Sequence, residues 1–177
     1  MSFESTEETS VVELNRDPAV VSSVVSVIAG FLAVLVTAPA LGLAIPFGLA
    51  GVLFLALGLF RVGSRGWVSL GVTSIFIGIV VVGALGAAPP LTLLTGAVAL
   101  FVSWDVGQHA VTVGEQFGRT APTQRGEVVH AAASSLVGVL AAGVAYGIYL
   151  FGAGDQPALA IILLLLGVVG LVWALRD

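Results

Sequence analysis

Long uncharged runs separated by short polar segments are the main pattern of this chain. No residue is charged between Pro18 and Phe60, and none between Gly66 and Trp104. A third run, from Val128 to Gly154, carries no carboxylate and no arginine. A membrane-spanning helix needs about 20 apolar residues. Each of the first two runs is therefore long enough for two spanning helices, and the third is long enough for one.

Proline and glycine divide these runs. Pro39 lies within TAPALG, AAPP ends at Pro90, and GAGDQP ends at Pro157. Proline disfavours helix in the residue before it, so each segment predicts a turn. The predicted helices lie near 19–37, 41–60, 67–86, 90–104, 127–151 and 157–175. The sequence thus predicts an all-α membrane protein with six transmembrane helices arranged as three hairpins.

The arginines indicate an orientation. If six helices alternate in direction, both termini and the loops near residues 61–65 and 105–126 lie on one side. All six arginines fall on that side: Arg16, Arg61, Arg65, Arg119, Arg125 and Arg176. The excess of positive charge in cytoplasmic loops predicts that this side is cytoplasmic. We therefore expect a multi-pass protein of the plasma membrane with both termini in the cytoplasm.

Composition supports the membrane assignment. The chain is 58% hydrophobic and 9% charged, with a mean hydropathy of +1.14, whereas soluble domains carry roughly 25% charged residues. Residues 1–17 are acidic and polar and predict a mobile tail ahead of a transmembrane domain at 18–177. The chain has no cysteine and no lysine, and its net charge is −4. This composition resembles that of proteins from salt-loving organisms, and it provides no basic surface for nucleic acid.

The segment from Trp104 to His130 is the one long polar stretch between the hydrophobic runs. If the fourth helix continues past Trp104, apolar and polar residues form two neighbouring stripes at the helical period. The apolar stripe is Val106, Ala110, Val113 and Phe117. The polar stripe is Asp105, His109, Thr112 and Gln116, extended by Gln108, Glu115 and Arg119. We expect an amphipathic extension of this helix to about residue 118.

Two pairs of polar residues in this segment each share a helix face. Asp105 and His109 are one turn apart, and Glu127 and His130 have the spacing E-x-x-H. Two imidazoles and two carboxylates suit Zn, Fe or Mn. Di-metal helical bundles, however, use two E-x-x-H pairs and two more glutamates, and here there is one such pair. The alternative is a hydrogen-bonded and ionic network at a helix end that serves as a docking surface, which is the interpretation we favour.

Other chemistry finds little support. The sequence has no nucleophile motif, no phosphate-binding loop and no H-E-x-x-H motif. No carboxylate or arginine lies at mid-depth in any predicted span, as ion or proton paths usually require, which leaves only a small neutral solute for a transporter. We expect a non-enzymatic membrane subunit, without a cofactor, whose segment 105–130 docks a cytosolic or membrane partner. A metal-dependent membrane enzyme and a neutral-solute transporter remain the alternatives, and the sequence leaves room for a homo-oligomer.

Small residues predict where helices pack closely, because lipid offers no hydrophobic drive between helices. Gly71 and Gly78 share a face of the third helix. Ser134, Gly138 and Ala142 recur every four residues on the fifth.

The segment SWDVGQHAVTVGEQFGR, followed by the pattern T-x-R-x-E-x-x-H from Thr123 to His130, resembles an uncharacterised family of small multi-pass membrane proteins from haloarchaea. The resemblance covers most of the chain after the tail. Members of that family have no established activity and are thought to be encoded near a MoxR-type ATPase and a transglutaminase-like protein. The resemblance therefore implies an accessory role in a membrane-associated assembly or maturation system, and it transfers no catalytic residue.

Overall fold

The computed structural model describes residues 16–40, 42–119 and 121–152, which contain helices and turns but no strand. The chain divides into two compact units, residues 1–139 and 140–177, and the contacts discussed below all lie within the first. Most of the predicted tail and the predicted sixth helix near 157–175 fall outside the described residues.

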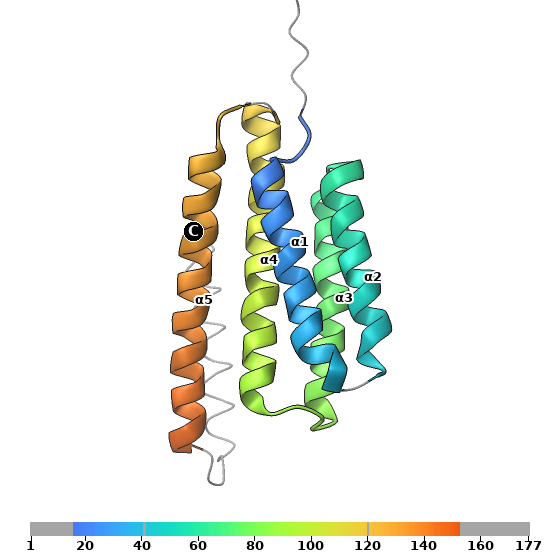
Figure 1. Cartoon of the computed structure of the whole chain (residues 1–177), viewed down its shortest axis with the longest axis vertical. Coiled ribbons are helices and arrows are strands. Elements are labelled where there is room, and N and C mark those ends of the chain that lie inside the picture. Colours follow the sequence, from blue (N-terminus) through green and yellow to red (C-terminus); the bar gives the residue numbers. More distant parts are fainter. Residues whose placement is uncertain (1–15, 41, 120, 153–177) are drawn as a thin grey trace, which may run out of the picture. The chain divides into compact units, whose positions relative to one another are not determined.

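Five helices follow one another along the described chain (Figure 1). They are α1 (Val20–Thr37), α2 (Ala44–Leu57), α3 (Arg65–Ala84), α4 (Pro90–Phe117) and α5 (Gln124–Gly152), with a short 3₁₀ turn at Ala38–Ala40 and a π-helical turn at Gly58–Val62. All five, with α2 counted through its π-helical turn, are long and apolar enough to cross a membrane.

Proline and glycine define two of the helix ends. Pro90 is the first residue of α4, where its fixed backbone angle suits a helix and its missing N–H costs nothing. Gly63 has a φ of 61° and ends the π-helical turn after α2, while its N–H bonds to the carbonyl of Gly58. This left-handed conformation favours glycine, so α3 can begin two residues later at Arg65.

The helices pair differently from the predicted hairpins. In the described part of the chain, α1 makes its most extensive contact with α4, and α2 makes its own with α3. In Figure 1, α1 lies beside α4, and α3 beside α2. The predicted hairpin partners, α1 with α2 and α3 with α4, contact each other less. The reason lies in where small residues allow two backbones to approach each other.

Glycines form the contact between α2 and α3. A Cβ atom at Gly71 would lie 2.7 Å from the carbonyl oxygen of Gly51, and a Cβ at Gly51 would lie 2.6 Å from that of Gly71. Further along α3, a Cβ at Gly78 would lie 3.4 Å from the carbonyl oxygen of Ala44. Gly71 and Gly78, singled out from the sequence, therefore face α2.

Serine and glycine form the contact between α1 and α4. Ser22, Ser26 and Gly30 recur every four residues on α1 and are all buried. The Ser26 hydroxyl donates a 2.6 Å hydrogen bond to the carbonyl of Ser103. A Cβ at Gly107 would lie only 2.7 Å from the Ser26 oxygen. These small side chains let the two backbones come close, as they do in membrane helix pairs.

Apolar side chains cover much of the outer surface. Leu49, Leu53, Leu70 and Phe76, among others, are more than a third exposed. A monomer in water rarely exposes contiguous apolar surface of this extent. Lipid is the solvent that matches this surface, which agrees with the length and apolarity of the helices.

Candidate functional site

The polar segment is built on an unbroken α4. This helix has 28 residues, which corresponds to a length of about 42 Å, whereas the hydrocarbon core of a bilayer is about 30 Å thick. Val106, Ala110 and Val113 are buried along the side that faces the other helices. Phe117, the last residue of the predicted apolar stripe, is instead 58% exposed. The end of α4 near Phe117 is called the polar end below.

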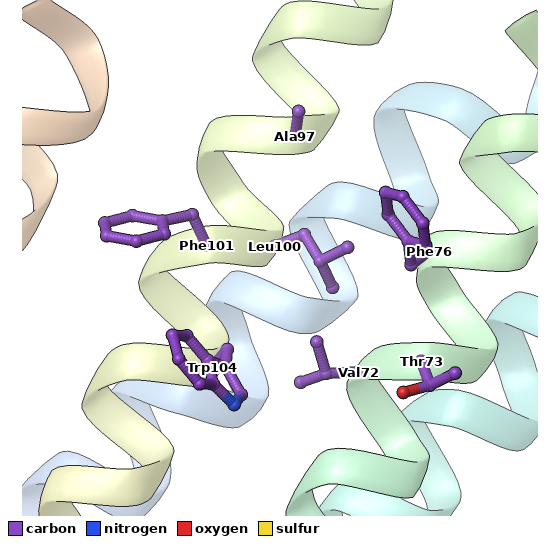
Figure 2. A pocket seen from close by; sticks show the side chains of 7 residues that line it. All are labelled: Val72, Thr73, Phe76, Ala97, Leu100, Phe101 and Trp104. Atoms are coloured by element: carbon purple, nitrogen blue, oxygen red, sulfur yellow. The ribbon is translucent and has the colours of Figure 1, made fainter. Parts of the chain in front are cut away.

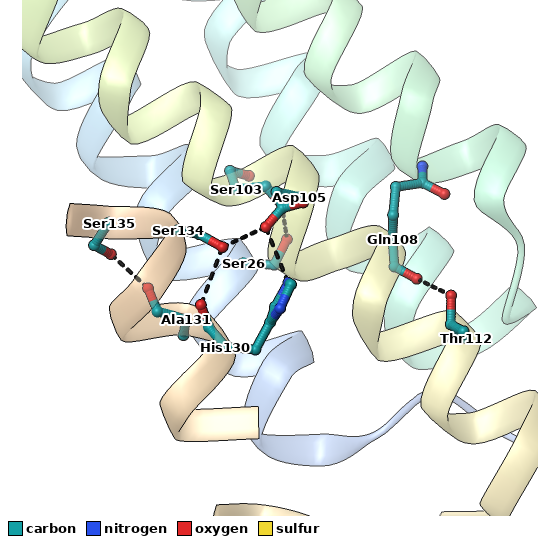
Figure 3. Close-up of polar contacts among 9 residues, drawn as sticks. All are labelled: Ser26, Ser103, Asp105, Gln108, Thr112, His130, Ala131, Ser134 and Ser135. Carbon is teal, nitrogen blue, oxygen red and sulfur yellow. Dashed lines mark hydrogen bonds and ion pairs between the residues drawn. The ribbon is translucent and has the colours of Figure 1, made fainter. Parts of the chain in front are cut away.

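Asp105 joins α4 to the first turns of α5 (Figure 3). Its Oδ2 atom lies 2.9 Å from Nε2 of His130 and accepts a hydrogen bond from the Ser134 hydroxyl. The Ser134 hydroxyl also lies 3.0 Å from the carbonyl oxygen of His130, one turn earlier. Nε2 of His130 makes no well-directed hydrogen bond among the described residues, so its contact with Asp105 is an ion pair when the imidazole is protonated.

The two histidines of the chain lie face to face. The ring centroids of His109 on α4 and His130 on α5 are 3.9 Å apart, and the ring planes differ by 19°. Asp105 and His109 lie on one face of α4, as the helical spacing predicts, and both contact His130. Stacked imidazoles of this kind hold two helices together through their ring faces.

Glu127 is used differently from the other acidic side chains. It is only 3% exposed, and its Oε2 atom accepts a 2.7 Å hydrogen bond from the backbone N–H of Ser22, in the first turn of α1. Its Oε1 atom accepts a 2.8 Å hydrogen bond from the Thr123 hydroxyl. The first N–H groups of a helix lack partners within the helix and favour negative charge. Glu127 of α5 therefore caps the N-terminus of α1.

Asp105, His109, Glu127, His130 and Ser134 are called the polar cluster below. Glu115 and Arg119 lie apart from it. Glu115 forms a 2.7 Å ion pair with Arg65 on α3, and both side chains are half-exposed. Arg119 lies 3.5 Å from the carboxylate of Asp17. These two residues connect the end of α4 to α3 and to the residues that precede α1.

The contacts of these side chains bear on the metal hypothesis. His109 and His130 are close enough to share an ion, as the metal hypothesis requires. Yet their rings present faces to each other, and both Glu127 oxygens accept hydrogen bonds. Within the described residues, no three His, Asp or Glu side chains are placed to hold a metal together. The observed contacts of the cluster join α1, α4 and α5.

A hollow of about 280 Å³ lies beside the cluster, at the polar end. Its walls combine apolar side chains with the edges of the polar network: His109, Val113, Phe117, Pro122, Thr123, Gly126 and Glu127.

Three partners in this cluster were not anticipated. Ser134 follows His130 by one helical turn, so its spacing could have placed it beside Asp105. Thr123 precedes Glu127 by the same interval. The N–H of Ser22, by contrast, lies 105 residues from Glu127, and no local pattern indicates such a contact.

The comparisons with known proteins give a family and no activity. No curated protein and no solved structure matched the chain. A family model described as a family of unknown function, DUF7519, matches residues 16–172. This match includes all five described helices and every residue of the polar cluster, and the chain therefore belongs to the DUF7519 family.

Proposed function

We propose that the protein is a non-enzymatic membrane subunit whose segment 105–130 docks a partner protein at the polar end of α4 and α5. The observation that carries this proposal is the hollow beside His109 and Glu127, with the exposed ring of Phe117 at its wall. It lies near the end of a helix that is about 12 Å longer than a bilayer core requires.

The surroundings of the hollow support a rigid docking surface. The Asp105, His130 and Ser134 contacts fix α5 against α4 on one side, and Glu127 fixes α5 to α1 beneath it. Binding to a surface that is already ordered avoids the entropic cost of ordering it. An exposed phenylalanine beside a hollow is also the type of group that anchors protein interfaces.

The partner that fits this surface has an apolar or aromatic side chain to enter the hollow. An acidic residue beside that side chain would pair with Arg125, which is exposed near the start of α5. A buried apolar anchor with charged groups at the rim is the usual arrangement of such an interface.

The resemblance to haloarchaeal membrane proteins suggests where to look for that partner. A MoxR-type ATPase and a transglutaminase-like protein, if encoded beside this chain, are the first candidates. In this proposal the protein anchors a membrane-associated assembly or maturation system. The polar end then faces the cytoplasm of the plasma membrane, in agreement with the arginine distribution.

Orientation can be measured directly, because the chain has no cysteine. Single cysteines at Ser64, Thr123 and Ala88 would be labelled in intact cells with a membrane-impermeant thiol reagent. We expect labelling at position 88 only. Outside labelling at 64 or 123 would place the polar end outside the cell and would exclude a cytosolic partner.

Docking is tested with the detergent-purified protein and each purified candidate partner. Phe117→Glu places a charge at the hollow and should weaken binding at least about 30-fold, the loss of a residue that contributes about 2 kcal/mol or more. Phe60→Glu is the matched control, since Phe60 is also exposed but lies in the π-helical turn after α2. Equal affinity of both variants for a partner that binds the natural chain would show that docking occurs elsewhere.

A further inference from the structure

A second hollow opens on the membrane-facing side of the bundle, between α3 and α4 (Figure 2). It measures about 290 Å³ and is lined almost entirely by apolar side chains: Val72, Thr73, Phe76, Ala97, Leu100, Phe101 and Trp104. Phe76, Phe101 and Trp104 are all more than a third exposed at its rim, and none of the seven belongs to the polar cluster.

The hollow lies on the seam where α3 meets α4. Nearer to the polar end, this seam is lined by polar side chains. Gln108 follows Trp104 by one turn of α4, and its side-chain amide donates to the hydroxyl of Ser69 at 3.3 Å. One turn further, Arg65 donates to Thr112 at 3.3 Å and pairs with Glu115 at 2.7 Å. Apolar lining and polar side chains therefore follow one another along a single seam.

The spacing of the two parts matches half of a bilayer. Thr73 and Phe76 are eight and eleven residues from Arg65 on α3, which corresponds to about 12 and 17 Å along the helix axis. A hydrocarbon core about 30 Å thick has half-thickness near 15 Å. With Arg65 at the membrane surface, the hollow lies near the bilayer centre, at the depth that the end of a lipid chain reaches.

We propose that this seam binds one anionic phospholipid, with a hydrocarbon chain in the hollow and the phosphate at Arg65. The apolar lining selects hydrocarbon, because an unpaired polar group in such a hollow would be costly. One terminal nitrogen of Arg65 contacts Thr112 and Glu115, and its other N–H groups are suited to phosphate oxygens. The Ser69 hydroxyl, which accepts from Gln108, can donate to the ester and glycerol region. The inference is independent of the docking surface near Phe117.

A transmembrane helix fits this seam less well than a lipid chain. Helices associate in membranes through small residues that let backbones approach, as Gly51 and Gly71 do between α2 and α3. The rim here is instead formed by Phe76, Phe101 and Trp104, which hold a second helix backbone away. A single flexible chain can still pass between these rings.

The test is native mass spectrometry of the whole, delipidated protein with dioleoyl phosphatidylglycerol or dioleoyl phosphatidylcholine added. Ala97→Phe and Thr73→Phe fill the hollow from α4 and from α3. Both positions are exposed, and two variants guard against one failing to fold. Each should lose the adduct with one bound lipid, while Ala132→Phe, an exposed alanine of α5, should keep it.

The head group is tested by charge removal. Arg65→Gln should reduce the preference for phosphatidylglycerol over phosphatidylcholine to about one, whereas Arg61→Gln should leave it unchanged. The proposal is overturned if Ala97→Phe and Thr73→Phe retain the adduct, or if Ala132→Phe loses it equally. It is also overturned if filling the hollow abolishes a dimer while lipid binding persists, because a second chain would then be the occupant.

Discussion

Two contacts of α4 use opposite means to hold a neighbouring helix. Against α1, small residues let the backbones approach. Gly107 lies against Ser26, and the Ser26 hydroxyl donates a hydrogen bond to the Ser103 carbonyl. Against the first turns of α5, long polar side chains make the contact, through Asp105 with His130 and through the His109–His130 stack. The first contact leaves no space, and the second borders a hollow of about 280 Å³.

The difference shows that one helix can provide both a close-packed contact and a polar contact beside an open surface. A glycine and serine seam gains stability from close van der Waals contact, which tolerates no added volume. A contact through polar side chains tolerates changes in shape but depends on each partner of the network. We therefore expect the α1 contact to be sensitive to size and the α5 contact to be sensitive to chemistry.

The largest effect should come from added volume between α1 and α4. Gly107→Leu places a side chain where even a Cβ lies 2.7 Å from the Ser26 oxygen, so we expect a loss of about 3 kcal/mol or more in the free energy of unfolding. Gly126→Leu, where nothing described lies within 4 Å of a Cβ, should change it by less than about 0.5 kcal/mol. Thermal unfolding in detergent measures both. Equal melting temperatures would refute the close α1 contact.

Removal of the buried carboxylate should have the next largest effect. Glu127→Ala leaves the N–H of Ser22 without its partner, and we expect a loss of about 2–3 kcal/mol, as for a buried charged hydrogen bond. Glu115→Ala is the control, since Glu115 is half-exposed in its pair with Arg65 and should cost less than about 1 kcal/mol. If the two variants unfold alike, Glu127 does not cap α1.

Added volume on α5 should have a smaller effect than added volume between α1 and α4. A Cβ at Gly138 would lie 3.1 Å from a methyl group of Val98 on α4, and Val98 is only half-buried and can shift. Gly138→Leu should therefore cost about 1–2 kcal/mol, in the lower part of the range for overpacking. Gly143→Leu, with nothing described within 4 Å, serves as its control. An unchanged melting temperature for Gly138→Leu would mean that residue 138 faces lipid.

Local patterns in the sequence predicted the helices, but not how they pair. The uncharged runs and the prolines at 39 and 90 indicated an all-helical chain with spans close to those of α1 to α4, because composition and turn chemistry are local properties. The helical period predicted that Asp105 and His109 share one face, and both contact His130.

The pairing of helices depends instead on small residues far apart in sequence. Ser26 and Gly107 belong to helices that the predicted hairpins did not join, and the Glu127 cap on α1 spans a longer interval of 105 residues. Charge patterning alone also could not separate Glu115, which pairs with Arg65 on α3, from the residues of the cluster.

The smallest effect, and the one that decides between a structural cluster and a metal centre, is expected for the two histidines. His130→Ala removes the contact with Asp105 and the stack on His109, both of them partly exposed, and should cost about 1 kcal/mol. His109→Ala removes only the stack and should cost less. Because the two substitutions remove one shared contact, the double variant should cost less than their sum. Elemental analysis of the purified natural chain accompanies the unfolding series. Stoichiometric Zn, Fe or Mn that disappears in either single variant would mean that the rings turn their nitrogen edges toward a shared ion, since each imidazole would then be a ligand. A modest, non-additive loss of stability without stoichiometric metal would mean that the stacked rings of His109 and His130 serve to hold α5 against α4 beside the hollow.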